Sequence, residues 1–299
     1  MAGTLLVRYG ELALKSPPVR REFESTLRRN ILDQFVRAGL PARIRSDRGH
    51  LYVDADDPTA AARLVRRVFG VTSVSVVHEV ASDRTAIRDR LLELAEPKLL
   101  HGVSFAVRAR RTGTHPFTSQ ELARDLGGDV LERFADRDLK VDLEHPQVEL
   151  FVEVRGPRTY LYFDRYDGPG GLPLGVAGHL VAVVDGPRGA LGAYMMMKRG
   201  CRVALATADA GVSLVDSVLS RFDPTAPVDR LEADPAEQAR TLARLAERSR
   251  ADGIVLPLGI DQFAEARAAW GDRVLFSPTV GLTDEEVDRR WHHVAELAG

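Results

Sequence analysis

The chain has 299 residues and a formal charge of −2, from 41 basic and 43 acidic side chains. A hydrophobic fraction of 44% with 28% charged residues is typical of folded proteins and excludes a mainly disordered chain. The near-neutral balance excludes nucleic-acid binding by bulk charge, but it leaves room for a local basic surface. The single cysteine, Cys201, excludes an internal disulfide and any cysteine-only metal site within one chain.

Charge is distributed unevenly along the chain. Residues 1–53 hold ten basic and five acidic side chains, whereas residues 171–299 hold 14 and 18. If the protein has a polyanionic ligand, the N-terminal part of the chain is where we expect it to dock. No apolar run reaches the length of a bilayer span, and the opening Met1–Tyr9 lacks the order of a signal peptide. We therefore expect a cytoplasmic protein without a membrane partner.

The first 80 residues predict a ferredoxin-like β-α-β-β-α-β unit. Apolar residues recur every four positions at Phe23, Leu27, Ile31 and Phe35, which indicates an amphipathic helix. The expected elements, in chain order, are Thr4–Tyr9, Pro18–Ala38, Ala42–Ser46, His50–Asp54, Pro58–Val68 (opened by Asp57) and Thr72–Val80.

A second unit follows, with two helices and a strand hairpin. Thr118 and Glu121 have the spacing of a capping box at a helix start. The expected elements are Arg84–Leu100, Ser104–Arg110, Thr118–Phe134, Val148–Val154 and Thr159–Asp164. A glycine- and proline-rich linker, residues 167–178, comes next.

The last unit alternates apolar strands with helices, which predicts a doubly wound parallel sheet. The expected strands are His179–Val184, Arg202–Ala206, Gly253–Leu258 and Val274–Phe276, and the helices are Ala190–Arg199, Ala236–Arg250, Gln262–Ala269 and Asp284–Ala298. The chain as a whole is thus expected to combine α+β and α/β domains. We place their bounds at residues 1–79, 80–166 (with a start near 60 as the alternative), the linker 167–178, and 179–299.

One segment of the second unit has the features of a phosphate-binding surface. Arg108 and Arg110 fall on the same face of a strand, and Arg111 follows them. The capped helix start at Thr118 and Ser119 offers free N–H groups and a partial positive charge. The alternative interpretation is an exposed strand whose arginines are merely solvated.

Several spaced motifs resemble those of the tRNA 4-thiouridine synthases, also called tRNA sulfurtransferases. The first is Arg8-Tyr9-Gly10-Glu11-Leu12-Ala13-Leu14-Lys15. The others, in the same order as in the family, are Arg21-Glu22-Phe23-Glu24, Val68-Phe69-Gly70-Val71-Thr72-Ser73, Thr118-Ser119-Gln120-Glu121, Gly170-Gly171-Leu172-Pro173-Leu174-Gly175 and Tyr194-Met195-Met196-Met197-Lys198-Arg199-Gly200. The resemblance covers roughly residues 5–205 and weakens afterwards.

The resemblance implies that the first unit is the family's ferredoxin-like domain and the second its THUMP domain, which together hold the acceptor end of tRNA. It therefore implies RNA contacts for the residues Arg108, Arg110, Arg111, Thr118 and Ser119. Lys15, Arg20 and Arg21 are weaker RNA-binding candidates, because surface solvation explains them equally well. We expect recognition of RNA backbone and shape rather than of base edges.

The third unit resembles the family's ATP pyrophosphatase domain, in which a Ser-Gly-Gly-x-Asp-Ser loop wraps the pyrophosphate of ATP. The aligned stretch here is Val184-Asp185-Gly186-Pro187-Arg188-Gly189. It loses the serine hydroxyls, gains the Asp185 carboxylate, and loses the N–H donor of residue 187 to proline. We therefore expect a degenerate nucleotide loop and no cofactor, with ATP and magnesium only if the chain is an active synthase. Arg188 would compensate partly as a point charge, but it cannot hold magnesium.

Two further departures from the family agree with this. The family's Thr-Gly-Glu is here Leu256-Pro257-Leu258, and the catalytic cysteine that the family has late in this domain has no counterpart. We expect a shortened domain and no appended rhodanese domain. Cys201 is expected to be a small core residue rather than a persulfide carrier.

Three hypotheses follow. The leading one is a tRNA-binding protein without its own adenylation chemistry, which acts as a scaffold beside a separate sulfur-transfer or tRNA-modification partner; the family implies a homodimer. The first alternative is an active tRNA 4-thiouridine synthase that uses Arg188 and an external persulfide donor. The second is a small-anion-binding regulator that does not bind RNA.

Overall fold

The computed structural model describes residues 3–10, 16–47, 49–262, 264, 266–267 and 273–299. The chain divides into two compact units, each formed from several segments of the sequence. The first unit holds residues 1–6, 52–62 and 75–166, and the second holds residues 7–51, 63–74 and 167–299. Among the described helices, none has both the length and the apolar character needed to cross a bilayer.

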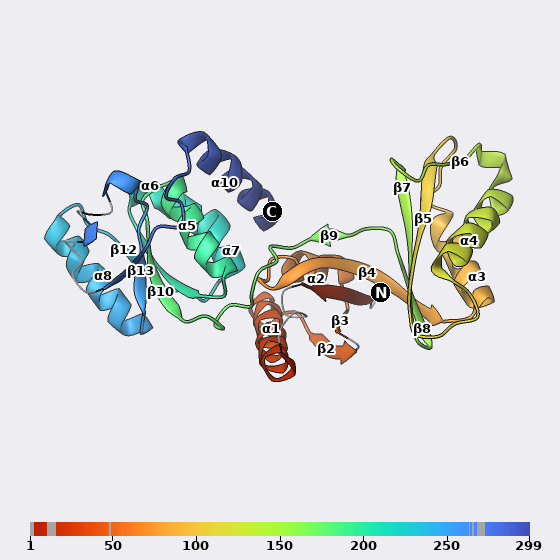
Figure 1. Ribbon diagram of the computed structural model, residues 1–299, viewed down its shortest axis with the longest axis horizontal. Helices are drawn as coiled ribbons and strands as arrows, with labels where there is room; N and C mark the ends of the chain where they lie inside the picture. Colours follow the sequence, from red (N-terminus) through yellow and green to blue (C-terminus); the bar gives the residue numbers. More distant parts are fainter. Residues whose placement is uncertain (1–2, 11–15, 48, 263, 265, 268–272) are drawn as a thin grey trace. The chain divides into compact units, whose positions relative to one another are not determined.

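The N-terminal elements follow the predicted ferredoxin-like order (Figure 1). The strands are arranged β2-β3-β1-β4, and Asp57 opens α2 by accepting hydrogen bonds from the N–H groups of Thr59 and Ala60 at 3.0 Å each. The elements are β1 (Gly3–Tyr9), α1 (Pro17–Ala38), β2 (Ala42–Asp47), β3 (His50–Ala55), α2 (Pro58–Val65) and β4 (Val71–Ala81).

Most of the first unit is a sheet with two helices on one face. In this sheet β5 runs parallel to β7, which pairs antiparallel with β8, and β8 pairs antiparallel with β4. The helices pack on Leu150, Val152 and Val154, which alternate along β7 and form one buried core with the apolar stripes of both helices. The elements are α3 (Arg84–Ala95), β5 (Ser104–Thr112), α4 (Ser119–Arg133), β6 (Lys140–Val141), β7 (Val148–Arg155), β8 (Arg158–Tyr162) and β9 (Tyr166–Asp167).

The second unit contains the predicted parallel, doubly wound sheet, with the strand order β12-β11-β10-β13-β14. Helices α5 and α10 pack on one face through the core that includes Leu180 and Ala182, and α8 packs on the other through Val181 (Figure 1). The elements are β10 (His179–Val184), α5 (Pro187–Lys198), β11 (Arg202–Thr207), α6 (Asp209–Leu214), a π-helical turn (Val215–Leu219), α7 (Ser220–Phe222), β12 (Val228–Arg230), α8 (Pro235–Ser249), β13 (Gly253–Val255), β14 (Val274–Phe276) and α10 (Asp284–Ala298).

Some boundaries in this unit differ from the expected ones. Helix α5 begins at Pro187, three residues before the predicted Ala190, because proline at the first helical position has the helical φ already set. Strand β13 ends at Val255 rather than Leu258. The predicted helix Gln262–Ala269 lies partly outside the described residues. The segment between β11 and α8 folds into elements that periodicity did not predict.

Close packing fixes the start of α5 against the end of β10. A Cβ atom at Gly189 would overlap the carbonyl oxygen of Val183, and one at Gly211 would overlap the carbonyl oxygen of Val184. Only glycine fits at these positions unless the backbone shifts. The loop between β10 and α5 is therefore tightly held by its surroundings.

Candidate functional site

Arg108 and Arg110 share one face of β5, as predicted, and this face is opposite to the one on which α3 and α4 pack. Their β5 neighbours Phe105 and Val107 point into the core beneath the helices, so the alternating arginines point the other way. In the parallel register, Arg108 is level with Phe151 of β7 and Arg110 with Glu153.

The charge of Arg108 is already engaged by the protein. Its Nε donates to Glu149 Oε1 at 2.8 Å, and its Nη2 donates to the carbonyl oxygen of Leu143, also at 2.8 Å. The side chain is 35% exposed. Arg108 thus ties the segment before β7 to strand β5, and its guanidinium has fewer free donors than an isolated surface arginine.

Arg110 and Arg111 are more open. Both are exposed, and Arg111 makes one hydrogen bond, from Nη1 to the carbonyl oxygen of Gly113 at 2.9 Å. Within the described part of the chain, Arg110 forms no side-chain hydrogen bond or ion pair. Nearby, His115 stacks on Phe117 with ring centroids 5.6 Å apart. The open cationic groups of this strand are therefore at its carboxyl end.

The predicted capping box opens α4. Thr118 Oγ1 accepts from the N–H of Glu121 at 3.1 Å, and Glu121 Oε2 accepts from the N–H of Thr118 at 2.7 Å. These hydrogen bonds hold the pKa of the Glu121 carboxyl below its usual value. A carboxylate thus occupies the helix start where a phosphate was expected, and it weakens Thr118 and half-buried Ser119 as anion ligands.

Of the three weaker RNA-binding candidates, Arg20 and Arg21 of α1 lie within the described residues. Arg20 and Arg21 are exposed in the first turns of the helix. Lys15 lies outside the described residues. Close to them, Glu24 accepts a 3.1 Å hydrogen bond from the Tyr9 hydroxyl, and burial beside this carboxylate raises the pKa of Tyr9 to about 12. The α1 arginines and the β5 arginines stay predicted RNA ligands.

The candidate nucleotide loop lies at the carboxyl end of the central strand β10. In an open parallel sheet, ligands bind where the strand order reverses, and β10 lies between β11 and β13 at that point. The loop residues follow the order Val184, Asp185, Gly186, Pro187, Arg188 and Gly189. The family resemblance thus aligns this loop at the position where the fold class places its ligands.

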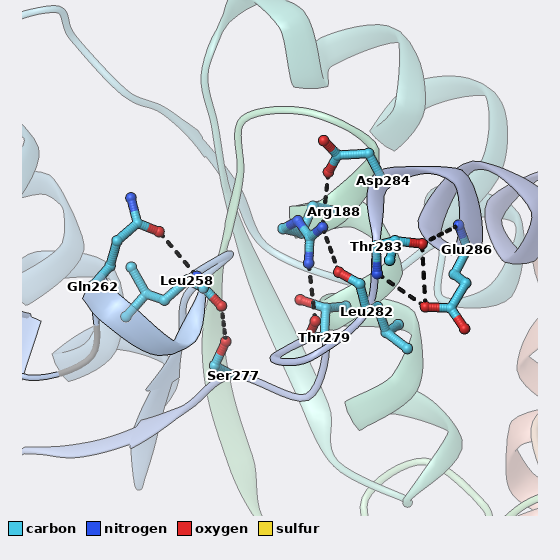
Figure 2. A network of polar contacts seen from close by, with 10 residues as sticks. Arg188, Leu258, Gln262, Ser277, Thr279, Leu282, Thr283, Asp284 and Glu286 are labelled. Atoms are coloured by element: carbon cyan, nitrogen blue, oxygen red, sulfur yellow. Dashed lines mark hydrogen bonds and ion pairs between the residues drawn. The ribbon is translucent and has the colours of Figure 1, made fainter.

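The Arg188 side chain is directed towards the segment before α10 (Figure 2). Its Nη1 donates to the carbonyl oxygen of Thr279 at 2.9 Å, and its Nη2 donates to the carbonyl oxygen of Leu282 and to Asp284 Oδ1 at 2.8 Å each. The side chain is 22% exposed. The guanidinium therefore joins α5 to the segment that leads into α10.

The sequence contained no signal for this contact, because the partners of Arg188 lie more than 90 positions away. Two further polar contacts lie in the segments that follow β13 and β14 (Figure 2). Ser277 Oγ donates to the carbonyl oxygen of Leu258 at 2.8 Å, and Gly259 N–H donates to Gln262 Oε1 at 2.9 Å. At the beginning of α10, Thr283 and Glu286 form a second capping box.

Asp185 and Pro187 occupy the places where a phosphate loop needs donors. Desolvation raises the pKa of the Asp185 carboxyl above its ordinary value. Pro187, at the first helical position, has no N–H group. Among the described residues, no cluster of three or more His, Cys, Asp or Glu side chains has the arrangement of a metal site.

Cys201 is a core residue in the structure. It is 5% exposed, and its Sγ lies 3.4 Å from the carbonyl oxygen of Ala177. Burial, with a smaller contribution from Asp252, raises the pKa of the thiol above its usual value. A thiol with a raised pKa is a weak nucleophile, which agrees with the predicted structural role.

Comparison with known proteins identifies the first two domains. Residues 4–75 match the ThiI ferredoxin-like domain model, and residues 81–164 match the THUMP domain model. A probable tRNA sulfurtransferase of Methanobrevibacter smithii is 33% identical over 235 residues, and one of Halobacterium salinarum is 34% identical over 255 residues. The chain thus contains a ThiI ferredoxin-like domain and a THUMP domain, and over most of its length it is similar to curated tRNA sulfurtransferases.

The alignments cover most of this chain but a smaller share of each relative. The aligned region covers 77% of this chain but 59% of the M. smithii relative, and 82% of this chain but 64% of the H. salinarum relative. The chain thus spans between half and two thirds of the curated relatives it matches.

Solved structures extend the similarity to the third domain. PH1313 from Pyrococcus horikoshii Ot3 superposes with a TM-score of 0.82 at 25% identity, covering 98% of this chain and 99% of that chain. A 4-thiouridine synthetase, solved as an RNA complex with bound ATP, superposes with a TM-score of 0.77 at 21% identity, covering 100% and 86%. The predicted fold class, a ferredoxin-like domain, a THUMP domain and a parallel-sheet domain, is confirmed.

Proposed function

We propose that this chain binds tRNA through its ferredoxin-like and THUMP domains and acts in tRNA modification without adenylating the RNA itself. A separate sulfur-transfer or tRNA-modification protein supplies the missing chemistry. The proposal rests on the contrast between Arg110 and Arg111, which are exposed with most of their donors free, and Arg188, whose guanidinium is engaged by the protein.

The RNA part of the proposal is supported by the THUMP match and by the chemistry of these arginines. Arginine recognises phosphate oxygens through paired N–H donors, and such contacts position a protein on RNA without reading its sequence. Arg110 and Arg111 are adjacent at the open end of β5, where a bound backbone would replace water as their partner. Arg108 holds the neighbouring segment in place and acts as a positioning residue.

The residues of the 184–189 loop do not fit a bound triphosphate. Asp185 adds a carboxylate where phosphate oxygens would lie, and each unmade donor in a buried site costs about 1–3 kcal/mol. Arg188 would have to leave the carbonyl oxygens of Thr279 and Leu282 and the Asp284 carboxylate to reach a phosphate. No step of the proposed function therefore uses ATP bound to this loop.

Two measurements on the purified chain test the proposal. Fluorescence anisotropy with labelled tRNA should show saturable binding that weakens steeply as salt rises, because phosphate contacts release counterions. Calorimetry with magnesium and ATP should show no heat of binding under the same conditions. Saturable ATP binding in the micromolar range would overturn the ATP part, and absence of tRNA binding at low salt would overturn the RNA part.

An active tRNA 4-thiouridine synthase is the second candidate. The superposition with a 4-thiouridine synthetase that binds ATP and RNA favours it, since the parallel-sheet domain keeps the same fold. This candidate predicts that deleting the gene removes the near-ultraviolet absorption of 4-thiouridine from bulk tRNA, and that the purified chain restores it with ATP and a persulfide donor. Restoration by the chain together with a second adenylating protein, but not alone, supports the first proposal instead.

A further inference from the structure

Four arginines gather at the carboxyl end of α10 in the second unit. They are Arg63, Arg66 and Arg67, from the last turn of α2 and the residues after it, and Arg221 of α7; we call them the arginine cluster. Arg67 Nη2 donates to the carbonyl oxygen of Gly299 at 2.9 Å, and Arg221 Nη1 donates to that of Ala298 at 3.3 Å. Arg67 and Arg221 are more than 150 residues apart in the sequence, and they bind the oxygens of two consecutive residues at the end of α10.

The positive charge of the arginine cluster is not balanced. Within the described ranges, no Asp or Glu forms an ion pair with any of the four guanidinium groups. The nearest favourable field is the carboxyl end of α10, which is worth about half an elementary charge against four positive ones. Burial and the charges of Arg221, Arg66 and Arg63 all lower the pKa of Arg67, as expected where like charges repel.

Two donors of the arginine cluster are also unused. The Nε atoms of Arg66 and Arg67 are buried, and neither has a hydrogen-bond partner among the described residues. A buried N–H donor without an acceptor opposes folding. The arginine cluster therefore combines an excess of positive charge with two unused donors, and a phosphate group supplies both the negative charge and the acceptor atoms that would satisfy them.

A purely structural role explains only half of the arginine cluster. Arg67 and Arg221 can be regarded as caps of α10, because they bind its last carbonyl groups. Arg63 is exposed and Arg66 half-buried, and among the described residues neither side chain forms a hydrogen bond or an ion pair. Surface arginines that serve only solubility gain nothing from being gathered where they repel one another.

We propose that the arginine cluster binds phosphate groups of the RNA backbone, as a contact in addition to the predicted THUMP surface. Guanidinium forks match phosphate oxygens in pairs, and four of them on two separate segments suit successive phosphates of a strand. Arg221 lies outside both segments that match the family's domain models. This inference rests on the proposed function, because RNA is the ligand in both.

The test removes the two charges that do not cap α10. The double variant Arg63→Gln/Arg66→Gln is compared with Arg289→Gln/Arg290→Gln, which removes two exposed charges from the same unit about 12 Å earlier along α10. Binding of labelled tRNA is measured by fluorescence anisotropy over a series of salt concentrations. Circular dichroism melting of each variant shows whether the fold is kept.

The Arg63→Gln/Arg66→Gln variant should bind tRNA about tenfold more weakly at low salt, with a salt dependence whose slope falls by about 1.5, while the control keeps the wild-type values. Equal affinity and slope in wild type and variant would overturn the inference and leave the proposed function standing. Failure of the wild type to bind tRNA would instead overturn the proposed function. Inorganic pyrophosphate is the second probe: if it raises the melting temperature of the wild type but not of the variant, and tRNA binding is equal in both, the cluster is a site for free phosphate compounds and the RNA assignment is wrong.

Discussion

Arg188 Nη2 and Asp284 Oδ1 are joined by a 2.8 Å hydrogen bond across 96 positions of sequence. The same guanidinium binds the carbonyl oxygens of Thr279 and Leu282, so one side chain holds the segment before α10 against the start of α5. A residue aligned with the acidic position of a nucleotide loop therefore has structural partners in this chain.

The first prediction concerns the stability that this residue contributes. Replacing Arg188 with alanine should lower the free energy of unfolding by about 2–3 kcal/mol, because two backbone carbonyl groups lose a charged donor. Urea unfolding followed by tryptophan fluorescence measures this, since Trp291 of α10 is buried in the same core.

Asp284→Asn is the matched control for Arg188→Ala. The Asp284 side chain is 95% exposed, so its ion pair with Arg188 is screened by water and should contribute less than about 1 kcal/mol. If both variants lose the same free energy of unfolding, the hydrogen bonds to the carbonyl groups contribute nothing and the ion pair accounts for the whole effect.

The second prediction separates the β5 arginines by their partners. Arg110→Glu/Arg111→Glu should weaken tRNA binding by more than about tenfold without changing the melting temperature, because both side chains are exposed. Arg108→Ala should lower the melting temperature as well, since it removes the contacts to Glu149 and Leu143. Anisotropy and thermal melting on the same samples distinguish the two effects.

Arg124→Glu is the control for these variants, because Arg124 is 77% exposed on α4, which packs on the face of the sheet opposite to Arg110. It should leave the tRNA affinity within about threefold of wild type. If reversal at Arg124 is as harmful as at Arg110 and Arg111, RNA binding reflects overall charge rather than the β5 surface.

The third prediction is a pH dependence of the start of α4. The pKa of Glu121 is lowered in the folded protein by its hydrogen bonds with Thr118, so its carboxylate stabilises the fold above its unfolded-state pKa. That stabilisation should disappear as the pH falls through the lowered pKa. Glu121→Gln should therefore reduce the difference in melting temperature between about pH 7 and about pH 3.

The same substitution reports on the helix start as an anion site. Removing the Glu121 charge should leave the α4 N-terminus more attractive to phosphate and raise tRNA affinity at neutral pH. Unchanged affinity in Glu121→Gln would remove Thr118 and Ser119 from the RNA surface. Thr118→Ala measures the contribution of the helix cap by itself, and it should lower the free energy of unfolding by about 1 kcal/mol.

The fourth prediction concerns Cys201. Because the thiol is buried and its pKa is raised, iodoacetamide should label it far more slowly in the native chain than in urea. Mass spectrometry of the labelled protein measures the rates. Cys201→Ala should keep full tRNA binding, and a thiol that is labelled as fast in the native chain as in urea would contradict the core assignment.

Local patterns in the sequence were sufficient for many of the elements. The capping box at Thr118 and Glu121 formed as predicted, because its two partners lie three residues apart on one turn. The apolar run His179–Val184 became the central strand of a parallel sheet, since a strand buried on both faces has no polar alternation. The order of elements in the ferredoxin-like, THUMP and parallel-sheet domains depends on such short-range signals.

The partners of the charged residues were decided by the tertiary structure alone. The sequence showed Arg108, Arg188 and Arg67 as equivalent cations. The fold ties the first to Glu149 and the second to the segment before α10, and it places the third beside other arginines, where it binds the oxygen of Gly299. The physical reason is that a guanidinium reaches any acceptor that folding brings within about 3 Å, whatever its distance along the chain. Periodicity and capping motifs report contacts between residues a few positions apart. They carry no information about side-chain contacts between residues that are distant in the sequence.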